Sequence, residues 1–341
     1  MLLNFNSKYL VFFCSLSYCF YFISNNFVFS LIPIILCIAE IRNCLHILII
    51  FIAISLFFLS VDYYNSKDIL LLGISTTLYM YRFKSLNPLD ILKYNAYPIL
   101  IMLSYFLFLE PKNSSWLDSV LFQSRLSFDL FTGKFINPNP LGLVSAICAV
   151  GLILNKKYLF SVIPLITMMA TQSRAAILFL ILIFAIYYTQ SLKKMIIYVV
   201  ISLLSIFMLK DTLLFSRFSE SGDSGRSEHI GYYLSIFKEN YLTGYSIRQL
   251  DELYFNTGLA IDNMYYSLFI RYGIIMGGGI LFIYFYLFLK NFLIKDEYFR
   301  LRLSIFFSML VYGFFEKGFL FTYMLWIPLS ICFSNLKRVK V

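Results

Sequence analysis

Charged residues are scarce in this chain. Asp, Glu, Lys and Arg make up 13% of its 341 residues, whereas soluble domains carry roughly 25%. Hydrophobic residues reach 60% and aromatic residues 20%, which excludes a disordered chain. A water-soluble fold of this size is not expected to hide so much apolar surface. The composition therefore predicts a membrane protein.

Several motifs of nucleotide and metal chemistry are missing as well. The sequence has no Walker A loop, no Asp-x-Asp pair for a metal-bound nucleotide sugar, and only two histidines, without partners at metal spacing. We expect no cofactor and no metal. The net charge of +10 does not imply nucleic-acid binding. In a membrane protein, the positions of Lys and Arg indicate first of all which loops lie in the cytoplasm.

The six cysteines lie inside apolar runs or at the edge of one, away from the long polar segments. They show neither zinc-ligand spacing nor a disulfide framework. We predict that they pack as small apolar residues: Cys14, Cys19, Cys37, Cys44, Cys148 and Cys332.

Apolar runs recur along the whole chain at close to the length that crosses a hydrocarbon core of about 30 Å. The basic residues gather in alternate loops, which by the positive-inside rule puts both termini in the cytoplasm. We therefore predict an all-α polytopic integral membrane protein, a single membrane domain over 1–341 with about 12 transmembrane helices. The predicted spans are 8–24, 26–40, 44–61, 68–82, 96–110, 140–154, 157–171, 174–189, 194–210, 263–289, 300–315 and 319–335.

Two segments are too long to be turns, and this topology puts both outside the cytoplasm: 110–139 and the large loop 211–262. The large loop contains an apolar pattern with helical spacing, so we predict an amphipathic helix there. The apolar residues of this helix are Ile230, Tyr233, Leu234 and Phe237. Its cap is Ser224 or Ser227, and Gly244 lies beyond its end.

Arginines concentrate on this predicted outer face. Arg174 stands at the head of an apolar run, where it is either a topological anchor or an anion-binding residue. Arg226 opens the predicted loop helix, where free N–H groups and a guanidinium suit a phosphate; the alternative is an ion pair on a solvated loop. Arg271 lies about two helical turns inside a span and must face protein or water.

Asp262 and Asn263 precede the next apolar run, where a helix cap is expected and a carboxylate is also a candidate general base. His229, in the large loop, is a minor acid–base candidate.

Three stretches resemble the O-antigen polymerase and ligase superfamily of integral-membrane enzymes. These are Arg125–Ser127 with Gly133–Gly142, the segment Thr171-Gln172-Ser173-Arg174, and Arg226 followed by Tyr233 and the turn Glu239–Tyr245. The helix from Asp262 to Gly273 matches the family's following segment. Asp262 replaces the histidine of ligase-type members, and the turn lacks a second glycine. Both departures favour the polymerase (Wzy-type) branch.

The resemblance implies glycosyl transfer at the periplasmic face of a Gram-negative inner membrane, from a chain on undecaprenyl pyrophosphate to a new lipid-linked repeat unit. The expected partners are these repeat units, membrane lipid and a chain-length regulator protein, with no nucleic acid. The implied catalytic residues are Arg174, Arg226 and Asp262, and the implied substrate-binding residues are Arg125, Asn139, Arg248, Asn263, Arg271, Tyr233 and Tyr265.

Three alternatives stay open at this stage: a ligase of the same superfamily, a lipid-linked oligosaccharide flippase or secondary transporter, and a structural membrane protein. Transporters usually carry charged sites at mid-membrane on broken helices. In this sequence the apolar runs are nearly free of charge and the polar residues gather in one loop, which favours an enzyme.

Overall fold

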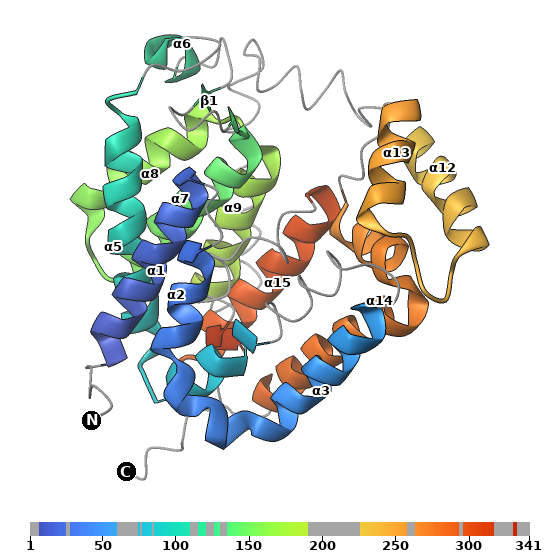
Figure 1. Ribbon diagram of the computed structural model, residues 1–341. Helices are drawn as coiled ribbons and strands as arrows, with labels where there is room; N and C mark the ends of the chain where they lie inside the picture. Colours follow the sequence, from blue (N-terminus) through green and yellow to red (C-terminus); the bar gives the residue numbers. More distant parts are fainter. Residues whose placement is uncertain are drawn as a thin grey trace.

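The computed structural model describes residues 7–24, 28–59, 74–75, 77–83, 85–109, 115–120, 126–129, 135–189, 226–257, 263–292, 296–316 and 330–332. Within these ranges the chain is helical, apart from one two-stranded antiparallel sheet (Figure 1). The elements are α1 (Ser7–Ser24), α2 (Val28–Leu36), the 3₁₀ helix η1 (Ile38–Glu40), α3 (Ile41–Leu59), α5 (Pro88–Phe106), α6 (Trp116–Val120), β1 (Phe128–Asp129), β2 (Phe135–Ile136), α7 (Pro138–Leu154), α8 (Tyr158–Ala170), α9 (Arg174–Tyr188), α12 (Arg226–Glu239), α13 (Ile247–Thr257), α14 (Met264–Phe292) and α15 (Phe299–Phe315).

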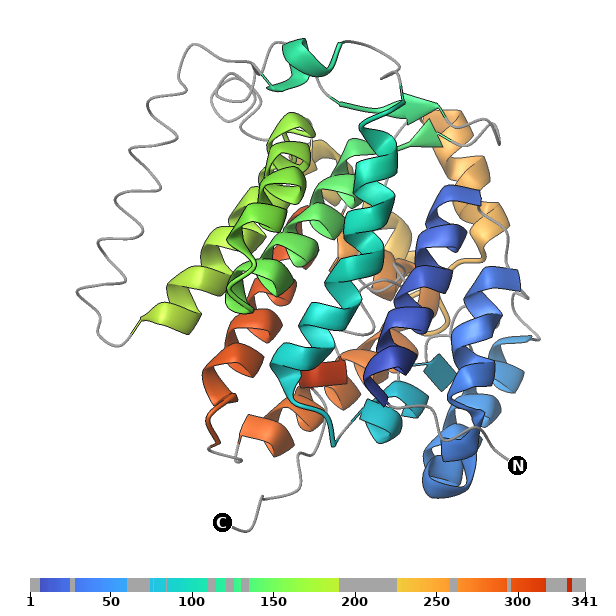
Figure 2. The same ribbon diagram turned by 90° about the vertical axis from the view of Figure 1, so that its left-hand side faces the viewer.

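Helix α7 lies at the centre of the main helix bundle, and most of its residues are buried around its whole circumference. Its sequence is apolar on every side, which is the pattern of a helix enclosed by protein. Helices α5, α8 and α9 surround it (Figure 2). The contact with α5 is close, because a Cβ on Gly151 would lie 2.6 Å from the carbonyl oxygen of Leu92.

Polar contacts tie α1 to the outer side of α5. The Lys8 Nζ atom lies 2.7 Å from a carboxylate oxygen of Asp90, and the buried Ser15 hydroxyl donates to the Asn95 amide oxygen at 2.5 Å. Such contacts satisfy polar groups that burial would otherwise penalise. They also fix the register of α1 on α5.

Helices α9, α15 and α14 form the other side of the bundle. The Phe179 ring, near the start of α9, meets the Tyr312 ring, near the end of α15, edge to face at 6.3 Å. On the α14 side, a Cβ on Gly313 would lie 2.8 Å from the Met264 side chain. The starts of α9 and α14 therefore lie beside the last turns of α15.

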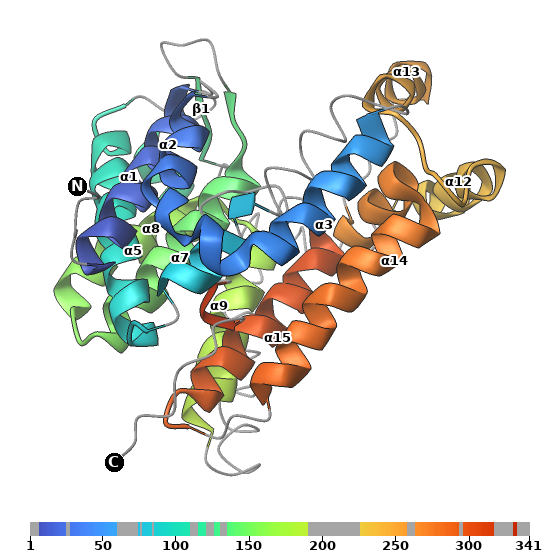
Figure 3. The same cartoon turned by 60° about the horizontal axis from the view of Figure 1, so that its bottom comes forward.

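Helices α12 and α13 form a separate unit beside the first half of α14 (Figures 1 and 3). Their contact has its own small hydrophobic cluster, made by Tyr233, Ile236, Tyr245 and Ile270. We call α12 and α13 together the loop unit, because they come from the predicted loop 211–262. The rest of that loop, 211–225 and 258–262, lies outside the described residues.

The expectation of about twelve transmembrane helices is wrong. Within the ranges that the structure describes, no helix combines the length and the apolar character needed to cross a membrane. Helices α7, α8 and α9 have 17, 13 and 15 residues, short of the roughly 20 that a span needs. Helix α5 carries Asp90, Lys93 and Asn95, and α14 is broken at Gly273.

The apolar runs nevertheless marked where many helices lie. The predicted segments 8–24, 140–154, 174–189 and 300–315 nearly coincide with α1, α7, α9 and α15. The predicted helix 194–210 and most of 319–335 lie outside the described residues. All six cysteines are buried and none forms a disulfide, which confirms that they pack as small apolar residues.

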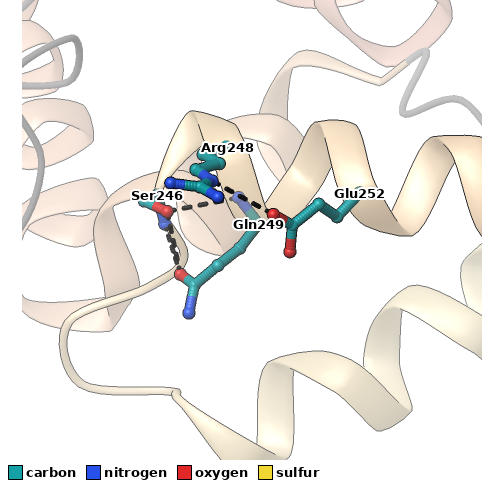
Figure 4. A network of polar contacts seen from close by, with 4 residues as sticks. All are labelled: Ser246, Arg248, Gln249 and Glu252. Atoms are coloured by element: carbon teal, nitrogen blue, oxygen red, sulfur yellow. Dashed lines mark hydrogen bonds and ion pairs between the residues drawn. The ribbon is translucent and has the colours of Figure 1, made fainter.

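Two ion pairs, one buried and one exposed, show how burial changes the contribution of an ion pair to stability. Arg302, at the start of α15, is buried and binds both carboxylate oxygens of Asp296, at 2.9 and 2.7 Å. Arg248 and Glu252 form a 3.1 Å pair on the exposed side of α13 (Figure 4).

We expect Asp296→Ala to lower the free energy of unfolding by about 3 kcal/mol, because it removes the carboxylate that compensates a buried guanidinium. Glu252→Ala is the matched control and should cost at most about 0.5 kcal/mol, since exposed pairs contribute little. Urea unfolding of the full chain measures both. Equal losses in the two variants would contradict the difference that burial predicts.

Candidate active site

Three helices begin at the same end of the bundle, each with a side-chain cap. Asn137 caps α7 by accepting from the Asn139 backbone N–H at 2.9 Å, and Ser173 caps α9 by accepting from the Ala176 N–H at 3.4 Å. Asn263 caps α14 by accepting from the Tyr265 N–H at 2.8 Å. Ser and Asn suit this position because a short polar side chain satisfies an N–H that the helix leaves unpaired.

The starts of α7 and α9 touch each other at Gly142. A Cβ at this position would lie 2.6 Å from the Thr171 hydroxyl oxygen and 2.8 Å from the Ser173 Cβ. Only a residue without a side chain allows this approach. It brings the first turn of α7, which contains Asn139, beside the turn that leads into Arg174.

The segment before β1 joins the same place, because the Leu126 N–H donates to the carbonyl oxygen of Ala170 at 3.0 Å. Residues 126–128, the first turn of α7 and the turn before α9 therefore converge. These are parts of two of the stretches on which the family resemblance rests. Arg125 itself lies outside the described residues.

The start of α14 is fastened to the end of α15. The Asn263 side-chain amide donates to the carbonyl oxygen of Phe314 at 2.9 Å, and the Tyr265 hydroxyl donates to the carbonyl oxygen of Leu310 at 2.8 Å. Glu316 follows directly and ends α15, with its N–H donating to the carbonyl oxygen of Tyr312. We call Asn139, Arg174, Asn263 and Glu316 the polar end of the bundle.

The polar end contains both positively and negatively charged groups. The N-termini of α7, α9 and α14 carry partial positive charge, and the half-buried Arg174 adds a guanidinium. Such an arrangement favours a phosphate or pyrophosphate, which a guanidinium binds through two hydrogen bonds. Glu316, also half-buried, supplies a carboxylate of the kind that removes a proton in general base catalysis.

Helix α14 is interrupted at Gly273, whose backbone angles are φ 66° and ψ 179°. Across the break, the turn of the loop unit supplies the missing partners. The Tyr245 N–H donates to the carbonyl oxygen of Ile270 at 2.7 Å, and the Ile274 N–H donates to the carbonyl oxygen of Tyr241 at 2.7 Å. The break therefore costs the helix no unsatisfied backbone groups at these two positions.

Arg271 lies directly before this break. Its guanidinium carbon is 5.3 Å from the centre of the Tyr272 ring, within the range of a cation–π contact. A Cβ on Gly244, which has a φ of 75°, would come within 2.6 Å of the Arg271 carbonyl carbon. The turn of the loop unit thus holds the Arg271 backbone in one position.

Tyr245 anchors that turn to α12. Its hydroxyl donates to the carbonyl oxygen of Ile236 at 2.9 Å and lies 3.2 Å from a Glu239 carboxylate oxygen. Burial and the neighbouring Glu239 charge raise the pKa of Tyr245 above its usual value. The hydroxyl therefore keeps its proton and remains a donor to Ile236 over a wider pH range.

The residues predicted for the site divide into groups. Asn139, Arg174 and Asn263 lie at the polar end, and the Tyr265 hydroxyl is bonded to α15 nearby. Arg271 and Tyr233 belong to the region where the loop unit meets α14.

The remaining predicted residues stand elsewhere. Arg226 is the first residue of α12, and only its backbone belongs to the described part of the chain. Arg248 is exposed and paired with Glu252 on α13. Asp262, predicted as a base, lies outside the described residues.

The amphipathic helix predicted in the large loop exists as α12, but one residue of its predicted apolar face is misplaced. Tyr233 and Ile236 are buried and Phe237 is half-buried, whereas Leu234 is exposed. The cause is the direction from which α14 approaches: Phe237 meets Phe269 and Ile236 joins the cluster around Ile270.

Sequence reasoning missed Glu316 and the cap of α13. Glu316 is an acidic residue directly after an apolar helix, a signal that the sequence does contain. Ser246 and Gln249 form a capping box, each side chain accepting from the other's backbone N–H, at 3.2 and 2.9 Å (Figure 4). The Ser-x-x-Gln spacing predicts such a cap.

No group of three metal-ligating side chains occurs among the described residues. Comparison with known proteins finds no matching family model, no matching curated protein and no matching solved structure. The chemistry of the site therefore has to be argued from its own residues.

The break in α14 leads to a test with glycines. We expect Gly273→Ala to lower the free energy of unfolding by about 3 kcal/mol or more, because its backbone angles suit glycine alone. Its Cβ would also lie 2.0 Å from the carbonyl oxygen of Leu242. Gly244→Ala should act in the same direction. Urea unfolding and hydrogen exchange at Tyr245 and Ile274 measure the effect.

Gly279→Ala is the matched control in the same helix. Apart from its chain neighbours and the backbone of its own helix, no described atom lies within 4 Å of its Cβ position. Alanine also favours a helix over glycine by up to about 1 kcal/mol. It should leave stability unchanged or slightly higher. Stable Gly273→Ala protein with unchanged hydrogen exchange would contradict the role given to the break.

Proposed function

We propose that this chain is a glycosyltransferase that polymerises a surface polysaccharide of the O-antigen type. In this reaction the growing chain moves from undecaprenyl pyrophosphate onto the sugar of a new lipid-linked repeat unit. The observation that carries the proposal is the convergence of the Asn137–Gly142 and Thr171–Arg174 segments at one end of the bundle, around Gly142. These segments carry the family resemblance, and they are separated by the remainder of α7 and the whole of α8.

The reaction needs no nucleotide, because pyrophosphate is already an activated leaving group. An acceptor hydroxyl oxygen forms a bond to the anomeric carbon of the donor chain, and the bond from that carbon to the pyrophosphate oxygen breaks. The electron pair leaves with undecaprenyl pyrophosphate, and a base takes the hydroxyl proton. The enzyme must stabilise the departing anion, remove this proton and align two substrates.

The polar end supports each of these tasks. Arg174 and three helix N-termini suit the pyrophosphate. Arg226, the first residue of α12, is a pyrophosphate ligand only on the evidence of the sequence. Glu316 follows the last turn of α15, to which the start of α14 is hydrogen-bonded. Among the described carboxylates it is the nearest in sequence to this contact, and we assign it as the candidate base. Arg271, fixed by the loop unit, is a second cationic group for the substrates.

A hydrophobic surface leads away from the polar end. Leu159, Val162 and Ile166 lie on one side of α8 and are 81%, 46% and 41% exposed. Helix α8 ends directly before the turn that leads into Arg174. An exposed apolar strip beside an anion-binding group suits a polyprenyl pyrophosphate, whose charged head and hydrocarbon tail need different surroundings.

The test is a deletion in the native bacterial strain, complemented with variants, with surface polysaccharide resolved by gel electrophoresis. We expect the deletion, Arg174→Ala and Arg226→Ala to leave core lipid with a single repeat and no ladder. Loss of an anion-stabilising donor typically lowers a rate by about 10²- to 10³-fold. Arg300→Ala is the matched arginine control, because Arg300 is exposed at the start of α15, away from the last turns of that helix beside the polar end, and it should keep the ladder.

The other outcomes discriminate against this proposal. Core lipid without any repeat, with repeats accumulating on the undecaprenyl carrier, would indicate a ligase or a flippase instead. An unchanged ladder in the deletion strain would overturn the assignment. Immunoblots of each variant show that equal amounts of chain are compared.

A further inference from the structure

The side chain of Asn263 caps two helices at once. Its Oδ1 atom accepts from the backbone N–H groups of Tyr265 and Tyr266, at 2.8 and 3.2 Å, which caps the start of α14. Its Nδ2 atom donates to the carbonyl oxygen of Phe314 at 2.9 Å. That carbonyl belongs to the last turn of α15, whose C=O groups the helix itself leaves unpaired. Three of the four hydrogen bonds that an Asn amide can form are thus made to the backbone.

Tyr265 strengthens this junction. Its hydroxyl donates to the carbonyl oxygen of Leu310 at 2.8 Å, and the centre of its ring lies 4.6 Å from that of Phe314. The two side chains therefore hold the last two turns of α15 against the start of α14. The family resemblance implies that Asn263 and Tyr265 bind substrate, whereas these contacts engage their polar atoms with the backbone of α14 and α15.

The end of α15 that they hold carries the candidate base. Glu316 comes two residues after Phe314, at the point where the backbone leaves the helix with φ −144° and ψ 139°. Its N–H still donates to the carbonyl oxygen of Tyr312 at 3.0 Å. Burial and, after it, the Glu316 charge raise the pKa of Tyr312, so the Glu316 carboxylate lies near this hydroxyl.

Tyr312 connects this end of α15 to the helix that begins at Arg174. Its buried ring meets the Phe179 ring of α9 edge to face at 6.3 Å, and Arg174 is the first residue of α9. The last turn of α15 therefore lies between α9, which carries the guanidinium, and the start of α14, to which Asn263 ties it. A shift of this turn would move the Glu316 carboxylate relative to Arg174.

We propose that Asn263 is a positioning residue for Glu316 and not a substrate ligand. By tying the last turn of α15 to the start of α14, it fixes where the Glu316 carboxylate receives the proton of the acceptor hydroxyl. This inference rests on the proposed function, with Glu316 as its base. A displacement of about 1 Å in a reacting arrangement can lower a rate by roughly 10²-fold, so a residue that touches no substrate can control the rate.

Asn263→Ser removes the donor to Phe314 and keeps the cap of α14, because serine and asparagine cap helices about equally well. The assay uses the purified full chain and undecaprenyl-pyrophosphate-linked repeat units from the native strain. We expect kcat to fall at least about tenfold and KM to change by less than about threefold. A residue that binds the substrate equally in the ground state and the transition state would instead raise KM and leave kcat unchanged. That result would overturn the inference.

Asn87→Ser is the matched control. Asn87 caps α5 by accepting from the Leu89 N–H at 2.8 Å, and it donates to the hydroxyl of Tyr298, directly before α15, at 2.5 Å. It thus makes the same kind of double contact at the other end of α15. This is also the end of the bundle where α7 ends, since the Asn155 amide donates to the carbonyl oxygen of Leu89 at 3.0 Å.

We expect Asn87→Ser to keep kcat, because it lies away from the polar end. Thermal unfolding of each purified variant shows that folded chains are compared. An equal fall of kcat in Asn87→Ser and Asn263→Ser would mean that α15 needs a tie at both ends for stability alone, and the specific role of Asn263 would be wrong.

A second background separates an effect through Glu316 from an independent one. We expect Glu316→Gln to lower kcat by about 10²- to 10⁴-fold, the usual contribution of a general base. In that background Asn263→Ser should cause no further loss, since residues that act as a unit are not additive. An equal further fall of kcat, or a fully active Glu316→Gln chain, would contradict the proposed role.

If Asn263→Ser does not accumulate, Tyr265→Phe replaces it with the same expected fall of kcat, because it removes only the hydroxyl donor to Leu310 and keeps the ring beside Phe314. The arms also separate this inference from the proposed function. If the deletion strain keeps its ladder, the proposed function fails. If Arg174→Ala loses activity while Asn263→Ser keeps it, only the role of Asn263 fails.

Discussion

The close contact between α7 and its neighbours is the constraint on which the rest of the fold depends. α7 is buried along almost its whole length, and two glycines, Gly142 and Gly151, allow α9 and α5 to approach its backbone. Any larger residue at either position would push a neighbouring helix outward. Because Gly142 also sets the distance between the starts of α7 and α9, the same contact that packs the core assembles the polar end.

The sequence predicted the positions of helices far better than their surroundings. Apolar runs such as 140–154 give no sign of whether lipid or protein will cover them, since the pattern of a helix buried on all sides is the same in both cases. In α7 the covering groups are other helices of the same chain. The step from apolar runs to twelve membrane spans failed because no described helix has both the length and the apolar character of a span. The predicted segments 8–24, 140–154, 174–189 and 300–315 nevertheless nearly coincide with helices.

The sequence indicated which types of residue form the candidate site, but only partly how these residues are arranged in space. Arg174 and Asn139 lie far apart in sequence, and their meeting depends on the approach at Gly142, which no local pattern reveals. Asn263 was expected as a cap, and it caps α14. Arg248 could not be distinguished from the other arginines, because its pairing with Glu252 depends on α13 turning that side outward.

The attachment of the loop unit has a consequence for how such a protein can diversify. The unit meets α14 through two main-chain hydrogen bonds around Gly273 and a small cluster of its own. These bonds involve no side chain on the outward faces of α12 and α13, so residues there can change without disturbing the contact as long as Gly244 and Tyr245 keep the turn in place. Substitutions on the outward faces of α12 and α13 can thus remodel this surface while the packing of the main bundle stays the same.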